Sequence, residues 1–430
     1  MKDIIQSLVA LMIGTLFVGA AGGLMNSYLG LQMNQAGFAT TTSGLLMSVY
    51  FIGLTLGSLR SHALIGRVGH IRSFAAFAAL YGITTLLYGL EISAPLWALW
   101  RFLSGVGFAG LLVCIESWLN GRANNQTRGR IFALYVILYY IGLGIGQQAL
   151  KMPVNETFNM FSAGAVMSML SLVPVVMTKF AGPTIEKASS FPLRELIRLT
   201  PLGVAGCIAS GLITSSFYTM GAIFAQKSGL DLDQTSTFMT TVILGGTLMQ
   251  FPIGRFSDKY DRRIVMLAVG SFTALVTLIL PWIRVSAFPV LLFLSFLYGA
   301  GIFSMYPLSV SHANDNVPPE HVVPASSQLV LLFSFGSILG PTFVSLFMLP
   351  FGARGFFVAT FTGLAAITVF CFQRLRQKPE IVPVTKFAPV LTHTAVLPNG
   401  EIEPELLDPE EKEPVEKIDP ETIEILDTRK

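Results

Sequence analysis

Hydrophobic residues occur in long runs that are separated by short polar stretches. Windows of about 20 residues, the length that crosses a bilayer as a helix, identify twelve apolar segments. They lie near residues 7–30, 42–64, 72–91, 96–120, 130–151, 157–178, 201–225, 235–254, 264–283, 287–310, 324–348 and 355–374. This pattern predicts an all-α membrane protein with twelve transmembrane helices.

The last six segments repeat the first six at an offset of about 192 residues. "GFATTTSGLLMSVYFIGLTL" (Gly37–Leu56) aligns without gaps with "GLDLDQTSTFMTTVILGGTL" (Gly229–Leu248). Further along, "GVG" and "GAG", and then "GLGIGQ" and "GSILGP", keep nearly the same spacing. Such a duplication predicts two pseudo-symmetric six-helix bundles with a binding site between them, near the middle of the membrane.

Polar stretches divide the chain into four predicted parts. Residues 1–178 form an N-terminal six-helix bundle, 179–200 a cytoplasmic connector, 201–376 a C-terminal six-helix bundle and 377–430 a tail. Within the connector, "PLRELIRL" predicts either a short amphipathic helix at the membrane surface or part of a flexible linker. The tail is rich in proline and acidic residues, so we expect a disordered acidic segment, either inert or bound to a partner.

Charge is scarce and unevenly placed. Only 12% of the residues are charged, against about 25% in soluble proteins. If the N-terminus is cytoplasmic, the inside loops and flanks hold eighteen basic residues and the outside loops four. This asymmetry satisfies the positive-inside rule and predicts cytoplasmic termini in a bacterial inner (plasma) membrane. Because the basic residues lie in loops between spans, we expect no nucleic-acid partner.

Signatures of an enzyme are absent from the sequence. It contains neither a Gly-Lys pair, which a Walker-type phosphate loop requires, nor a His-Glu-x-x-His zinc motif. The three cysteines lie inside predicted spans without metal-like spacing, so we expect them to be core residues. We therefore expect a protein that is not an enzyme and has no cofactor or metal. Any transport through it should be driven by an ion gradient or by the gradient of the substrate. We also expect a monomer.

The loop "GRFSDKYDRR" (Gly254–Arg263) is a candidate cytoplasmic gate. Gly254 permits a tight helix end. Asp258 is accompanied by Lys259, Arg262 and Arg263 and can form charge-assisted hydrogen bonds with them. Such a latch could hold one conformation. The alternative is a solvated basic loop that only obeys the positive-inside rule.

Three motifs resemble those of the major facilitator superfamily. The gate loop resembles the second copy of motif A, Arg101-x-x-x-Gly105-x-Gly107 resembles motif B, and Gly336-x-x-x-Gly340-Pro341 resembles motif C. A looser twin of motif C contains Gly142 and Gly146. Blocks such as "WRFLSGVG", "CIESWL" and "YPLSVSHA" resemble the YcaD-like branch. The resemblance implies a secondary transporter with alternating access, in which these glycines and Pro341 serve helix packing and hinge motion.

The sequence departs from the family pattern in two places. In the first copy of motif A, "HALIGRVGHIR", Gly66 stands where an acidic residue is expected, and His62 and His70 replace a glycine and a basic residue. Asp258 is therefore expected to carry the gate alone. Gln147 stands where the looser motif C would have proline, which weakens the inference of antiport that this motif implies.

Two ionisable residues, Arg101 and Glu116, fall in one predicted span. On a helix they lie about 60° apart in projection and about 22 Å apart along the axis, so they cannot pair directly. Glu116 could face interfacial water, and Arg101 could extend its side chain outward. Charge within a membrane usually marks an ion or substrate path. Under that interpretation Glu116 binds the coupled proton and Arg101 is its electrostatic partner or a substrate anchor.

Other polar side chains are candidates for the substrate cavity between the bundles. For each one, hydrogen bonding between helices is the alternative role. These candidates are Asn26, Tyr28, Tyr139, Tyr140, Gln147, Ser215, Ser216, Tyr218, Tyr306 and Gln328.

Together, these features predict a transporter that moves a small organic molecule across the membrane by alternating access, with proton coupling. Its expected partners are membrane lipid, the small-molecule substrate and protons. Two alternatives stay open. One is a transporter-like sensor or scaffold that acts through the acidic tail, and the other is an uncoupled facilitator.

Overall fold

The computed structural model describes residues 2–121, 128–153, 159–177, 191–318, 321–377 and Phe387. Most of the connector and of the predicted tail (377–430) lies outside these residues, so the expected disorder of the tail concerns a part that the structure does not describe.

The described residues contain thirteen α-helices. They are α1 (Lys2–Gln35), α2 (Thr40–Val68), α3 (His70–Leu87), α4 (Ala94–Asn120), α5 (Arg128–Ala149), α6 (Met160–Val176), α7 (Leu193–Leu199), α8 (Pro201–Lys227), α9 (Leu232–Ser257), α10 (Arg262–Ile279), α11 (Phe288–Asn314), α12 (Val322–Phe351) and α13 (Gly355–Gln377). Nine stretches of the described chain are long and apolar enough to cross a membrane, one of them containing both α12 and α13. The all-α membrane fold is confirmed, and the helices are consistent with twelve spans.

Local sequence signals set several helix ends. The Asp231 side chain accepts a hydrogen bond from the Gln234 N–H, and the Asp231 N–H donates to Gln234 Oε1, a capping box that starts α9. Gly69 separates α2 from α3 with a φ of 86°, a conformation that favours glycine. The segment "PLRELIRL" does form a short amphipathic helix, α7, with Leu196 buried and most other side chains exposed.

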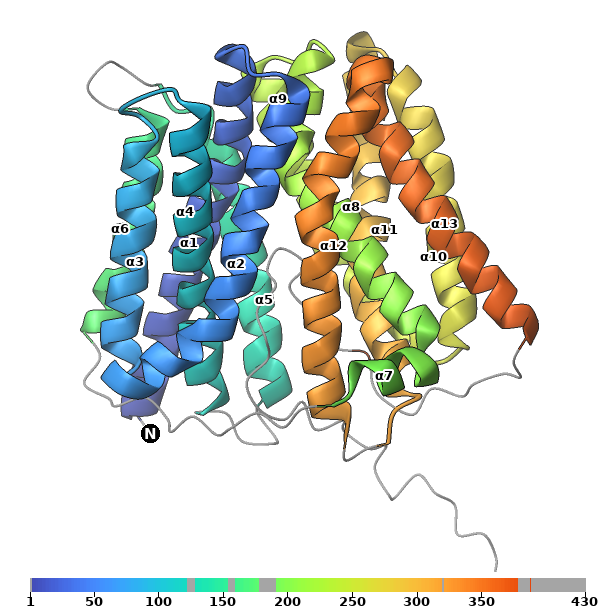
Figure 1. Ribbon diagram of the computed structural model, residues 1–430, viewed down its shortest axis with the longest axis horizontal. Coiled ribbons are helices and arrows are strands. Elements are labelled where there is room, and N and C mark those ends of the chain that lie inside the picture. The colour runs from blue at the N-terminus through green and yellow to red at the C-terminus, as the bar shows by residue number, and fades with distance from the viewer. Residues whose placement is uncertain are drawn as a thin grey trace, which may run out of the picture.

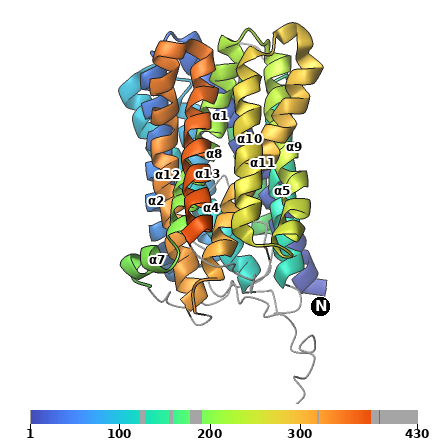
Figure 2. The same cartoon turned by 90° about the vertical axis from the view of Figure 1, so that its right-hand side faces the viewer.

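The long helices form two bundles, as Figure 1 shows: α1–α6 on the left (the first bundle) and α8–α13 on the right (the second bundle). The bundles meet where α2 packs on α12, α1 on α8 and α5 on α9. Both Figure 1 and Figure 2 place α7 and the N-terminus at the lower face. The upper face is the opposite one, where α1 and α8 end and α9 begins.

Glycines of the motifs lie where helix backbones approach closely. A Cβ added at Gly105 would collide with the Tyr50 carbonyl oxygen of α2, and one at Gly142 or Gly146 with carbonyl oxygens of α1. In the second bundle, Gly299 approaches α9 in the same way. A Cβ at Gly336 or Gly340 would meet carbonyl oxygens of α8. Equivalent glycines therefore bring equivalent helix pairs together in both halves.

Candidate functional site

Arg101 is a buried cation on α4. Its side chain is 1% exposed, and its guanidinium carbon lies 4.2 Å from the centroid of the Tyr50 ring on α2. Its Nη2 lies 3.2 Å from the Met47 sulfur, and its Nε has no hydrogen-bond partner among the described residues. No described carboxylate forms an ion pair with it. Arg101 is therefore held by an aromatic face and a thioether, and in this conformation it faces protein rather than water.

Glu116 is partly buried, lower on the same helix. The Tyr135 hydroxyl of α5 donates a hydrogen bond of 2.9 Å to Glu116 Oε1. Tyr306, on α11 of the second bundle, lies near the Glu116 carboxyl group. Glu116 therefore lies toward the interface between the bundles.

A line of tyrosines connects the surroundings of the two charges. Tyr139 lies one helical turn from Tyr135 on α5 and near Tyr50. The tyrosines thus lie in a line from Tyr50, on which Arg101 stacks, over Tyr139 to Tyr135, which donates to Glu116. The two charges make no direct contact, as their spacing on the helix requires.

Aromatic rings also meet across the bundle interface. The Phe303 ring of α11 lies 5.9 Å from Tyr140 of α5 and 5.4 Å from Tyr218 of α8, centroid to centroid, and both pairs pack edge to face. Tyr139 also lies near Tyr218. Three of the predicted cavity residues, Tyr139, Tyr140 and Tyr218, are therefore neighbours in the centre of the molecule.

Side-chain hydrogen bonds that join the two bundles lie near the upper face. Asn34 on α1 donates to Gln226 on α8 at 2.7 Å, and Gln148 on α5 donates to Thr240 on α9 at 2.7 Å. Lys151 forms a 3.0 Å ion pair with Asp233 at the start of α9. These contacts hold the bundles together at the upper face.

The predicted gate loop is an ion-pair network inside the second bundle. Arg262 Nε lies 2.7 Å from Asp315 Oδ2 at the end of α11, and Arg262 Nη2 lies 3.2 Å from Asp258 Oδ1. Arg263 pairs with Asp261, whereas Lys259 is exposed. Asp258 thus pairs with Arg262, one of the three cations that the sequence places beside it, and the network ties α9, α10 and α11 together.

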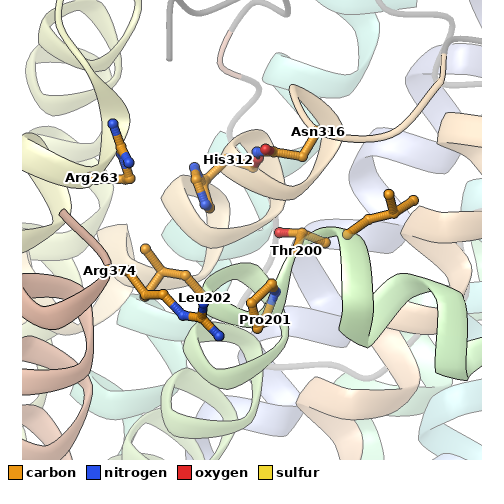
Figure 3. A pocket seen from close by; sticks show the side chains of 8 residues that line it. Thr200, Pro201, Leu202, Arg263, His312, Asn316 and Arg374 are labelled. Atoms are coloured by element: carbon orange, nitrogen blue, oxygen red, sulfur yellow. The ribbon is translucent and has the colours of Figure 1, made fainter. Parts of the chain in front are cut away.

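A small pocket adjoins this network at the lower face (Figure 3). Its lining comes from the start of α8, from α10, from the end of α11 and from α13, and includes Thr200, Arg263, His312 and Arg374. Arg263 is paired with Asp261, and the Arg374 guanidinium carbon lies 5.3 Å from the centroid of the Phe370 ring.

In the first bundle, the corresponding loop lies between α2 and α3 and is held by a histidine instead of an ion pair. His70, at the start of α3, lies 2.8 Å from the Ser117 hydroxyl of α4 through its Nε2. This pair involves His70, which stands where the family pattern has a basic residue, and it contains no carboxylate.

Several predicted cavity residues lie in helix contacts in this structure, and their role in the cavity stays a prediction. Ser215 and Ser216 are buried, donate to the Leu212 carbonyl and lie against Gly340. Gln147 donates to the Gly23 carbonyl. The remaining ones are Tyr28, which packs on Phe161 of its own bundle, Tyr306, which packs on Phe333, Asn26, which is buried, and Gln328, which is half-buried.

The residues that the sequence analysis missed are partners of those it found. Tyr50, Tyr135, Asp261 and Asp315 belong to the networks of Arg101, Glu116, Arg263 and Arg262. Tyr135 could have been identified from the sequence, because it lies one helical turn from the predicted site residue Tyr139. Tyr50 and Asp315 had none, since their partners lie far away in the sequence.

Comparisons with known proteins agree with this architecture. The Major Facilitator Superfamily model matches residues 11–151 and 202–398. The uncharacterized MFS-type transporter YcaD of Escherichia coli (strain K12) is 28% identical over 360 residues, which cover 83% of this chain and 93% of YcaD. YcaD of Salmonella arizonae is 28% identical over 340 residues, covering 79% of this chain and 88% of that protein.

Solved structures share the fold. A bacterial homolog of the human lysosomal transporter Spinster, in an inward-facing and occupied conformation, superposes with a TM-score of 0.69 at 17% identity, covering 86% of this chain and 96% of that one. The nucleoside transporter NupG gives a TM-score of 0.67 at 13% identity, covering 87% and 99%. With a family model that matches most of its length and a relative that matches most of both chains, this protein belongs to the major facilitator superfamily.

Proposed function

We propose that this membrane transporter is a proton-coupled secondary transporter of a small organic molecule, with Glu116 as the proton-binding group. One observation supports this above all: a carboxylate lies within a membrane-spanning helix and receives a hydrogen bond from Tyr135 of α5. Ionisable groups in such positions are costly and mark transport paths.

The substrate is proposed to bind beside the rings of Tyr139, Tyr140, Tyr218 and Phe303. These rings come from both bundles. A movement of one bundle relative to the other would therefore change the contacts of a molecule bound there. Arg101 acts on Glu116 through its electric field at a distance rather than by contact.

The lower face is proposed to be cytoplasmic, because it carries the N-terminus and α7 and because the basic loops satisfy the positive-inside rule. The hydrogen bonds at the upper face then describe a transporter that is closed toward the outside. Alternating access requires these contacts to break in each cycle, while the ion-pair network of Asp258, Arg262 and Asp315 serves as the gate of the second bundle. The motif glycines provide the close helix contacts around which the bundles move.

The test begins with a thermal-shift screen of metabolites and drugs on the purified protein to find a ligand. In proteoliposomes, that ligand should drive proton flux in the wild type and not in Glu116→Gln. The matched control is Glu91→Gln, which changes an exposed carboxylate in the loop before α4 and should keep normal flux. Wild-type flux in Glu116→Gln would remove Glu116 from the mechanism.

A further inference from the structure

Phe387, ten positions after the end of α13, contacts the gate loop of the second bundle. Its backbone N–H donates a hydrogen bond of 2.8 Å to Asp258 Oδ1. Its ring lies directly against Gly254, since a Cβ at that glycine would collide with the Cδ1, Cε1 and Cγ atoms of the ring. The ring also packs against an apolar cluster formed by α8, α10, α11 and α13.

The same carboxylate oxygen connects Phe387 to the ion-pair network. Asp258 Oδ1 accepts from Phe387 and lies 3.2 Å from Arg262 Nη2, and Arg262 in turn binds Asp315. Hydrogen bonds to an ionised acceptor are stronger than those between neutral groups. Docking of Phe387 therefore adds a partner to the residues that tie α9, α10 and α11 together.

Gly254 has a role that differs from the one expected from the sequence. It lies inside α9, which continues to Ser257, and it is not among the glycines with positive φ. Its helical conformation does not require glycine. Glycine is required at this position because a side chain would occupy the space that the Phe387 ring fills.

We propose that Phe387 is an intramolecular ligand of the gate loop, docked on Gly254 and Asp258, and that it stabilises the conformation seen here. Ten residues span up to about 33 Å when extended, so a tether of this length can reach from α13 to the end of α9. A tethered ligand also acts at an effective concentration in the millimolar range for short linkers. The ligand of the gate loop is thus a residue of the same chain. The stabilising role rests on the proposed alternating access, whereas the docking itself does not.

Docking is tested by hydrogen–deuterium exchange of the full-length protein in detergent, followed at the Phe387 amide. We expect this amide to exchange at least about tenfold more slowly than in an unstructured peptide, in line with a hydrogen bond worth roughly 1.4 kcal/mol or more. Gly254→Ala and Asp258→Ala should both return it to the unprotected rate. Gly66→Ala is the matched control, because a Cβ at Gly66 meets nothing within 4 Å. An unprotected Phe387 amide in the wild type would overturn the proposal, whatever the protein transports.

The stabilising role needs a readout that does not depend on a known substrate. Asn34→Cys places a reporter thiol at the upper face, and Cys114, Cys207 and Cys371 are buried, so background labelling should be low. In this background, Phe387→Ala should increase the rate of labelling by a membrane-impermeant maleimide by a factor of about three or more, because the conformation closed at the upper face loses a contact that stabilises it. Phe387→Leu, which keeps an apolar side chain, should have a smaller effect. An unchanged labelling rate in Phe387→Ala, with docking confirmed by exchange, would overturn the stabilising role.

Discussion

Tyr135 of α5 donates a 2.9 Å hydrogen bond to Glu116 of α4. The two helices otherwise touch little, whereas α5 packs against α9 of the second bundle. A displacement of α5 during opening would therefore change the environment of the carboxyl group. This bond connects the proposed proton site to the interface that moves.

Tyr135→Phe should reduce substrate-coupled proton flux about tenfold. The substitution removes one hydrogen bond to a carboxylate, a loss of roughly 1.5–3 kcal/mol, while the ring and its packing stay. The measurement is flux in proteoliposomes, with the exposed Tyr260→Phe as control. Equal flux in Tyr135→Phe and the wild type would show that the bond has no part in coupling.

Arg101→Met should abolish transport without lowering the melting temperature. A buried charge without an ionic partner costs desolvation energy, so an apolar side chain of similar length should leave stability unchanged or raise it. Arg101→Lys should also fail in transport, because an ammonium group loses the planar stacking on Tyr50.

The control for this pair is Arg354→Met, since Arg354 lies over Trp282 beside the upper end of α13 and away from the tyrosine line. Thermal unfolding and transport are measured on the same preparations. A large drop in melting temperature for Arg101→Met would mean that Arg101 serves the fold instead.

Gly146→Ala should destabilise the protein by about 1–3 kcal/mol, the usual cost of overpacking. A Cβ at Gly146 would collide with the Ala20 carbonyl oxygen of α1. Gly144→Ala, two residues away on α5, meets only a Thr240 methyl group at 3.8 Å and should be neutral or slightly stabilising. The check is thermal unfolding of both variants. Equal melting temperatures would argue against the close α1–α5 approach.

Cross-linking Asn34→Cys to Gln226→Cys with a short thiol-specific reagent should stop transport, and reductant should restore it. The two side chains join α1 to α8 across the bundle interface, and the proposed cycle must separate them. Gln32→Cys with Gln35→Cys is the control, because these residues lie on one helix and already interact there. Full transport in the cross-linked Asn34–Gln226 pair would contradict opening at the upper face.

The amino-acid sequence by itself determined the membrane class, the helix pattern and the duplication. The predicted segment 157–178, for example, corresponds to α6 (Met160–Val176), and 130–151 to α5 (Arg128–Ala149). Hydropathy and helical hydrogen bonding are local properties, so local windows capture them. Where the windows fell short, as at 7–30 against α1 (Lys2–Gln35), the helix continues beyond its most apolar part.

Only the tertiary structure decided the partners of the functional side chains. The sequence showed that Arg101 and Glu116 cannot pair, but Tyr50 and Tyr135 come from other helices and were found only in the fold. Asp315 likewise reaches Arg262 from the end of α11, and Phe387 reaches Gly254 from beyond the last helix. Such contacts join positions tens to more than a hundred residues apart, and side-chain packing between helices, which no local pattern encodes, selects them.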